Sequence, residues 1–148
     1  MAYTLYPAAT PYNLGEQKYI TVTSGTYVTF GKFTSCTGVL AKGGDNLTAV
    51  HLVRSTGPEQ GPPIDFNYSV AHNVLAILPA RIDFAKIVGF CNDWTRDVPA
   101  FLFLVKTIAA RTTGNAYPNY HNFLTKADEQ FRFRARIDDN NLIESMLV

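Results

Sequence analysis

Polar and apolar residues alternate along two stretches near the start of the chain, residues 19–23 and 26–30. Both are rich in β-branched and aromatic residues, which is typical of half-buried strands. Ser24-Gly25 separates them and predicts a tight hairpin. Two further apolar stretches, residues 37–41 and 47–53, flank a Lys-Gly-Gly-Asp-Asn turn and predict another pair of strands.

Apolar residues recur at helical intervals only once in the rest of the chain. Val70, Val74, Ile77 and Leu78 predict a helix over residues 66–78, and Pro79 ends it. Three segments predict strands, the first two of them buried: residues 87–90, 101–108 and 131–137. The first 16 residues predict an irregular arm, residues 92–97 a polar loop, and residues 142–147 a short apolar tail. The pattern indicates an α+β, strand-rich single domain over residues 1–148, with one or two helices.

Charge and length exclude several classes of protein. The 148 residues carry a net charge of +1 without a run of like charges, so no polyanionic partner such as a nucleic acid is expected. Arg132, Arg134 and Arg136 alternate with apolar residues, as on the solvated face of a strand. The N-terminus lacks the features of a secretory signal, and no stretch is long enough for a membrane span. We expect a cytoplasmic protein, or one delivered into a host cell without a cleaved signal peptide.

The chain has two cysteines, which are too few for a disulfide framework. Neither cysteine has the spacing of a metal ligand, so we expect no metal site at them. Cys91 follows an apolar run and is expected in the core. Cys36 is different because its neighbours Ser35, Thr37 and Gly38 are small. Small neighbours leave the sulfur approachable and let backbone amides face a reacting carbonyl oxygen.

His51 is the candidate base for this cysteine. The chain between Cys36 and His51 runs out, turns at Gly43-Gly44 and returns, which can bring the two residues onto neighbouring strands. A histidine beside a thiol raises the thiolate fraction and can protonate a leaving amine. We therefore expect an activated Cys36 with a pKa below that of a free thiol.

A third group must orient the imidazole. Thr29 is the candidate, because its strand leads into the cysteine loop, although a backbone carbonyl can perform the same role. His72 in the predicted helix and His121 in a loop are alternative bases. Asp93, beside the only tryptophan, is expected in a solvated turn, with the rim of a binding cleft as the alternative.

The segment 29–53 resembles the bacterial Cys-His protein-glutamine deamidases. This group includes the catalytic domain of the cytotoxic necrotising factors and the chemotaxis receptor deamidase. The matching elements are Ser35-Cys36 after a strand, then Gly43-Gly44, then Val50-His51. Thr29 is similar to a threonine upstream of the cysteine in the chemotaxis enzymes, but lies one residue further away. The resemblance covers about a sixth of the chain.

This resemblance implies a central β-sandwich with helices packed outside, no cofactor, and deamidation of an exposed glutamine on a protein substrate. Cys36, His51 and Thr29 would be the catalytic residues. A toxin or effector acting on host Rho-type GTPases is one setting, and a chemotaxis receptor as substrate is another. Two alternatives stay open. One is another cysteine hydrolase, such as a peptidase, or a transglutaminase on the same pair. The other is a non-enzymatic interaction domain.

Overall fold

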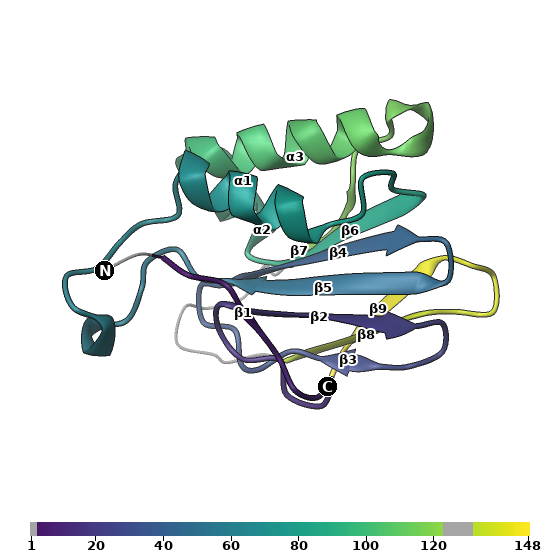
Figure 1. Ribbon diagram of the computed structural model, residues 1–148, viewed down its shortest axis with the longest axis horizontal. Coiled ribbons are helices and arrows are strands. Elements are labelled where there is room, and N and C mark those ends of the chain that lie inside the picture. Colours follow the sequence, from purple (N-terminus) through teal and green to yellow (C-terminus); the bar gives the residue numbers. More distant parts are fainter. Residues whose placement is uncertain (1–2, 123–131) are drawn as a thin grey trace.

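The computed structural model describes residues 3–122 and 132–148 (Figure 1). Within these residues the chain forms nine strands in two sheets and three α-helices, which confirms the α+β class. The helices gather on one side of the larger sheet, and the smaller sheet lies on the other (Figure 1). The two central strands of the larger sheet are buried along almost their whole length, as this arrangement requires.

The larger sheet has six strands in the order β1-β2-β5-β4-β6-β7. Its middle strands pair antiparallel, while the edge strands β1 and β7 pair parallel to their neighbours. The bounds are β1 Tyr6–Pro7, β2 Lys18–Thr23, β4 Thr37–Gly43, β5 Asn46–Leu52, β6 Phe84–Gly89 and β7 Asn119–Asn122.

The smaller sheet is antiparallel and consists of β3 Val28–Thr29, β8 Phe133–Ile137 and β9 Ile143–Leu147. Residues of β8 alternate as expected from the sequence. Its apolar residues are buried, while Arg134 and Arg136 point outward and stack on the ring of Tyr27 at 4.3 and 4.9 Å. Phe131, the first residue of the predicted strand, lies outside the described residues.

The helices are α1 Tyr68–Ile77, α2 Cys91–Asp97 and α3 Pro99–Arg111, and two short 3₁₀ helices span Pro58–Gln60 and Thr113–Asn115. The prediction of α1 is confirmed. The Asn67 side chain accepts a hydrogen bond from the Val70 amide at 3.1 Å and so caps the helix.

Two sequence-based predictions are wrong in this region. Residues 101–108, predicted as a buried strand, belong to α3. Pro99 is suited to the first turn of a helix, and the buried residues Phe101, Leu104, Val105 and Ile108 recur at helical spacing. Residues 92–97, predicted as a loop, belong to α2, which Trp94 anchors in the core. The structure therefore has more helices than the one or two expected.

The predicted hairpin at Ser24-Gly25 is also wrong. A turn does occur there, with Gly25 at φ 85°, but the chain then leaves the larger sheet. β2 pairs with β1 and β5, whereas β3 pairs with β8. Local turn chemistry alone does not determine which partner a strand finds. This crossing brings the residues after β3 beneath the middle of the larger sheet.

The N-terminal arm is irregular, as predicted, apart from the short β1. It is nevertheless tied to the sheet. Tyr3 is buried, and its hydroxyl donates to the Val53 carbonyl at 2.6 Å and accepts from the Val53 amide at 2.8 Å. The arm therefore lies along the end of β5 next to the residues that follow His51.

Candidate functional site

Cys36 and His51 lie on neighbouring segments of one β-hairpin. Cys36 immediately precedes β4, and His51 is in β5 directly opposite Gly38 of β4. Directly opposite residues of an antiparallel pair share a face, and so do alternate residues of one strand. Position 36 is therefore on the same face as His51, diagonally across the pair. The two positions are thus close along the hairpin, but no hydrogen bond between the Cys36 thiol and the His51 ring is present in this structure.

The two ring nitrogens of His51 have different surroundings. Nδ1 lies 2.8 Å from the backbone carbonyl oxygen of Leu14. A carbonyl can only accept, so Nδ1 carries the proton and Nε2 presents a lone pair. Nε2 is buried and has no hydrogen-bond partner among the residues described. This is the tautomer that a general base needs when it accepts a proton through Nε2.

Aromatic rings enclose the imidazole. Its ring centroid lies 4.6 Å from that of Phe33 and 5.8 Å from that of Phe30. Gly38 makes room for this packing, because a Cβ there would lie 2.8 Å from the Phe30 ring. Burial lowers the pKa of His51 to about 4, although the Leu14 carbonyl opposes the shift. The imidazole is therefore neutral at neutral pH.

Cys36 is 3 % exposed. Burial raises the pKa of its thiol to about 12, and the negative charge of Glu16 adds to the rise, while backbone hydrogen bonds from Ser35 and Thr34 oppose it. The expectation of a lowered thiol pKa is therefore wrong for this conformation. The sequence argument considered the neighbouring histidine but not the loss of hydration, which disfavours the thiolate. At neutral pH Cys36 is therefore a neutral thiol and His51 a neutral imidazole, and no hydrogen bond joins the two side chains.

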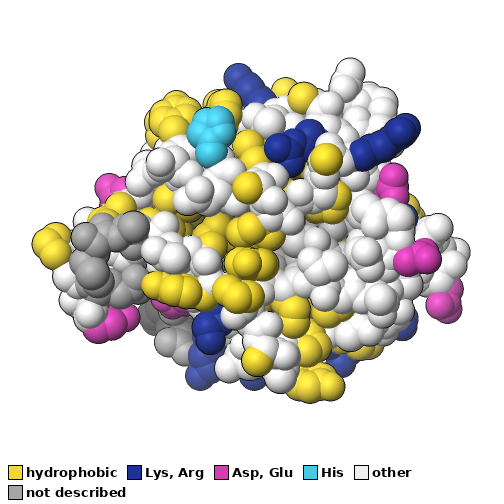
Figure 2. Space-filling view, viewed as in Figure 1, with side chains coloured by type: hydrophobic (Ala, Val, Ile, Leu, Met, Phe, Trp, Pro, Cys, Tyr) yellow, Lys and Arg dark blue, Asp and Glu magenta, His cyan; other side chains and the backbone are white. Residues whose placement is uncertain are grey.

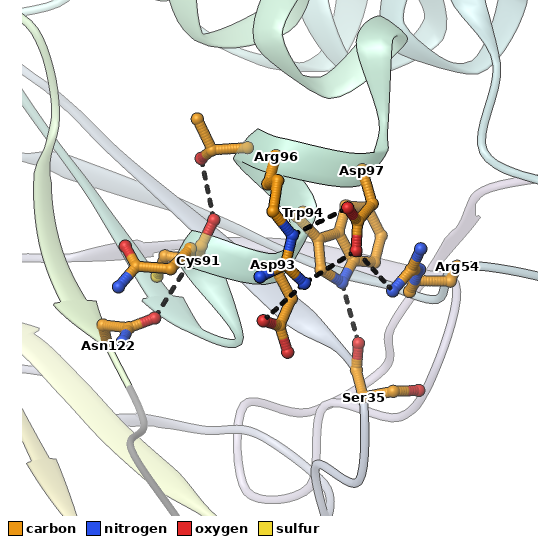
Figure 3. Close-up of polar contacts among 10 residues, drawn as sticks. Ser35, Arg54, Cys91, Asp93, Trp94, Arg96, Asp97 and Asn122 are labelled. Carbon is orange, nitrogen blue, oxygen red and sulfur yellow. Dashed lines mark hydrogen bonds and ion pairs between the residues drawn. The ribbon is translucent and has the colours of Figure 1, made fainter.

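Helix α2 and the end of β6 hold the cysteine loop in place (Figure 3). The indole nitrogen of Trp94 donates to the Ser35 carbonyl at 2.8 Å, and the amide of Phe90 donates to the Cys36 carbonyl at 3.2 Å. Gly89 has φ 107°, and a Cβ there would lie 2.6 Å from the Cys36 carbonyl oxygen. Only glycine therefore fits at position 89 while the loop keeps this approach.

Charged side chains line the outer side of α2 (Figure 3). Asp97 accepts from Arg96 at 2.8 Å and lies 4.0 Å from Arg54, which follows β5. Asp93 lies 3.3 Å from Arg96. Asp93 is thus part of a helix and not of the expected turn. These pairs are well exposed, so they contribute little to stability.

A cavity of about 420 Å³ opens on the His51 side of the site. Its lining includes the charged and polar residues Asn13, Glu16, Lys32 and Arg132, together with His51. The cavity is bounded by the N-terminal arm, by the segment after β3 and by the start of β8. The imidazole of His51 is itself fully buried, so a group entering this cavity meets the charged and polar lining first.

The structure separates the other predicted residues from this pair. Thr29 is in β3, and its backbone carbonyl accepts from the Leu14 amide at 2.7 Å. Thr29 is thus bonded to Leu14, and it is the Leu14 carbonyl that accepts from His51. The catalytic role of Thr29 stays a prediction. His121 is in β7 and is hydrogen bonded to the Ser145 hydroxyl at 2.8 Å. His72 is exposed on α1 and packs on Phe103.

Sequence reasoning missed Leu14, Glu16 and Trp94. Leu14 contributes only a backbone carbonyl, which no residue type reveals. Glu16 closes the irregular arm, where Gln17 adopts φ 61°, rare for a residue other than glycine. Trp94 could have been identified, because it stands in an otherwise polar segment and a buried indole needs a hydrogen-bond acceptor.

No group of three or more metal-ligating side chains occurs in residues 3–122 and 132–148. In the same parts of the chain no helix has the length and apolar character needed to cross a membrane. On the face drawn in Figure 2, apolar side chains extend across the middle, and lysine and arginine side chains are spread above and below them.

Comparison of the chain with protein-family models, curated proteins and solved structures found no match.

Proposed function

We propose that this chain is a cysteine hydrolase that deamidates a glutamine side chain on a protein substrate, with Cys36 as nucleophile and His51 as base. The observation that supports it best is the tautomer of His51. Leu14 holds the proton on Nδ1, and Nε2 is left with a lone pair on the face shared with position 36. A buried imidazole nitrogen without a partner costs free energy, so a function is the natural reason to keep it.

The chemistry follows from the neutral resting pair. Nε2 of His51 takes the thiol proton as the Cys36 sulfur attacks the carboxamide carbon. The carbon–nitrogen bond then breaks, and the imidazolium returns the proton to the departing ammonia. A thioester remains, and water attacks it with His51 again as base. The carbon–sulfur bond breaks, which yields a glutamate side chain and restores the thiol.

Neutral partners suit this sequence of events. A thiol with a pKa of about 12 is not ionised before the substrate arrives, so proton transfer accompanies the attack. The nucleophile, the base and backbone donors supply the groups that the reaction needs, so we propose no cofactor. The substrate must present its glutamine on an exposed loop, because the sulfur is nearly covered.

The resemblance of residues 29–53 to toxin and chemotaxis deamidases supports the choice of reaction. On that ground we propose an intracellular setting, either as a cytoplasmic enzyme or as an effector delivered into a host cell. Rho-type GTPases are the first substrates to test, and chemotaxis receptors the second. The new negative charge on the target would alter a switch or signalling loop.

The test is mass spectrometry of purified Rho-type GTPases, chemotaxis receptor domains and cell extract after treatment with the protein. We expect a gain of about one dalton at one glutamine, release of one ammonia, and an intact backbone. Cys36→Ser and His51→Asn should abolish the change. Cys91→Ser is the matched control, because Cys91 is also buried but lies at the start of α2, and it should retain the activity.

Two results would contradict the proposal. Cleavage of the backbone would make the protein a peptidase. Absence of any Cys36-dependent covalent change in all three substrate sets would leave the pair a structural feature of an interaction domain.

A further inference from the structure

Three arginines form a row on the outer face of the smaller sheet. Arg132, Arg134 and Arg136 are alternate residues, so they share one face, and the residues between them are buried. Arg132 continues the strand β8, because its carbonyl accepts from the Val148 amide at 3.0 Å. Neighbouring positions in the row are therefore about 7 Å apart along the strand. Each of the three side chains is partly exposed, and we call them the arginine row.

The ring of Tyr27 holds two members of the row in place. Tyr27 directly precedes β3, which pairs with β8. The guanidinium carbons of Arg134 and Arg136 lie 4.3 and 4.9 Å from the centroid of this ring. Stacking restrains a guanidinium without using its N–H donors. The row is therefore pre-organised, which lowers the entropy that a partner must overcome when it binds.

The arginine row has fewer carboxylates than it has charges. Arg136 forms an ion pair with Glu144 of β9 at 3.2 Å. In the parts of the chain that the structure describes, neither Arg132 nor Arg134 forms an ion pair. Two neighbouring guanidiniums are thus left without a counter-charge, and like charges at this separation repel each other.

The hydrogen bonds of these two arginines go to uncharged groups. Nε of Arg132 donates to the Phe30 carbonyl at 3.3 Å. Nη2 of Arg134 lies 3.1 Å from the Met146 sulfur, which is a weak acceptor. Nε of Arg134 is buried and has no partner among the described residues. These arrangements cost free energy in the isolated chain, and such costs are expected where a surface serves a function.

An extended acidic peptide matches the row in both charge and spacing. A carboxylate accepts two parallel hydrogen bonds from one guanidinium, which makes it a well-suited counter-charge. Alternate side chains of an extended peptide point to the same side and repeat about every 7 Å, the repeat of the row itself. Aspartate or glutamate at alternate positions would therefore place one carboxylate at Arg132 and the next at Arg134.

The surroundings of the row favour such a peptide over a nucleic acid. The chain has a net charge of only +1, whereas phosphate binding normally recruits a larger excess of cations. The Tyr27 ring is occupied by two guanidiniums and is not free to stack on a base. Glu144 pairs with Arg136 at one end of the row, and Glu16 lines a cavity with Arg132 at the other. These carboxylates would repel a long phosphate backbone.

We propose that the arginine row binds an extended acidic segment of a partner protein, with aspartate or glutamate at alternate positions paired to Arg132 and Arg134. This interaction does not depend on the proposed function, because neither Cys36 nor its chemistry takes part in it. Arg132 also lines the cavity that His51 borders, so one end of the bound segment lies at the mouth of that cavity.

The test is isothermal titration calorimetry with two acetylated and amidated peptides of equal composition. One consists of four Glu-Thr repeats, and the other has four glutamates followed by four threonines. A thymidylate octamer is the third ligand. Each is titrated into the full chain at about 50 mM and at about 500 mM NaCl, because salt screens contacts between exposed charges.

We expect the alternating peptide to bind about fivefold more tightly than the consecutive one, and to lose affinity at high salt. Arg132→Gln and Arg134→Gln should each weaken its binding about fivefold, the range of one exposed ion pair. Glu144→Gln should strengthen binding, because it frees Arg136 and removes a repelling carboxylate. Arg81→Gln is the matched control, since Arg81 is exposed but lies outside the smaller sheet, and it should bind as the wild type does.

The expected gain for Glu144→Gln guards against misreading a folding defect, because a variant that merely loses structure does not bind more tightly. The proposal is overturned if the alternating peptide does not bind, if the two peptides bind equally, or if Arg81→Gln loses as much affinity as Arg134→Gln. Tighter binding of the thymidylate octamer than of the alternating peptide would also overturn it and assign the row to nucleic acid. None of these results bears on the hydrolase proposal, which is tested through Cys36.

Discussion

The indole nitrogen of Trp94 donates a hydrogen bond to the backbone carbonyl of Ser35 at 2.8 Å, so a buried side chain of α2 holds the residue that precedes the candidate nucleophile. Trp94 also packs on Phe66 and Phe101, with ring centroids 5.4 and 5.2 Å apart. One residue therefore joins the helical layer to the cysteine loop.

Trp94→Phe keeps most of this packing and removes the N–H. We expect the unfolding free energy to fall by about 1 kcal/mol, because the part-buried hydrogen bond from the indole to the Ser35 carbonyl is lost. The value of kcat should fall about tenfold with KM little changed, since a displaced nucleophile affects the chemical step most. Urea unfolding and steady-state deamidation kinetics measure the two effects.

The control for Trp94→Phe is Phe66→Leu. It weakens the packing against the same indole and leaves the bond to Ser35 in place. Its stability should fall by a similar amount, while its kcat stays near that of the wild type. Equal losses of kcat in both variants would mean that Trp94 acts only through stability.

The two thiols should react slowly in the folded protein. Burial raises the pKa of both Cys36 and Cys91 to about 12, so at pH 8 each is alkylated by iodoacetamide about a thousandfold more slowly than a free cysteine. Glu16→Gln should raise the rate at Cys36 severalfold, because it removes a negative charge beside that sulfur alone. Peptide mapping of the alkylated protein follows both sites, and an equal increase at Cys91 would argue for general loosening.

Stability should depend on pH through His51. Its pKa is about 4 in the folded protein and near 6.5 when unfolded, so between these values the unfolded chain binds more protons. The free energy of unfolding should therefore fall as the pH drops from 6.5 to 4, by about 3 kcal/mol at most. His51→Asn lacks this contribution.

Urea unfolding of wild type and His51→Asn at several pH values isolates this contribution from that of the carboxyl groups. The difference between the two should shrink on acidification by the amount stated. A difference that stays constant from pH 7 to 4 would show that His51 is not held neutral.

Thr29→Val distinguishes the two candidates for orienting His51. The bond on Nδ1 comes from the Leu14 carbonyl, and Thr29 contacts Leu14 through its own backbone carbonyl. Removing the Thr29 hydroxyl should therefore leave kcat/KM within about twofold of the wild-type value. A loss of tenfold or more would return the orienting role to the hydroxyl.

The β4–β5 hairpin could be predicted from the sequence, because local signals define it. The strand patterns on either side of Gly43-Gly44 predicted the pairing that brings Gly38 opposite His51. The helical spacing of Val70 and Val74 likewise predicted α1. Where the pattern was ambiguous it failed: an apolar run such as residues 101–108 is compatible with a buried strand or a helix, and packing decided for the helix.

The rest of the site depends on contacts between distant parts of the chain. Leu14 reaches His51 across 37 positions, and Trp94 reaches Ser35 across 59. Neither contact leaves a periodic pattern, and one of them uses a carbonyl that every residue has. The depth of burial was equally hidden, and it is burial that reverses the expected shift in the Cys36 pKa.

The β4–β5 hairpin also has a consequence for the order of folding. Cys36 and His51 belong to one short hairpin, and closing a short loop costs less entropy than closing the long ones that bring in the arm and α2. A refolding chain therefore brings sulfur and imidazole near each other early. The Leu14 carbonyl holds the proton on Nδ1 of His51 only after the N-terminal arm has docked, so the tautomer proposed for catalysis forms last. A half-folded chain therefore has Cys36 and His51 near each other without the ring in that tautomer.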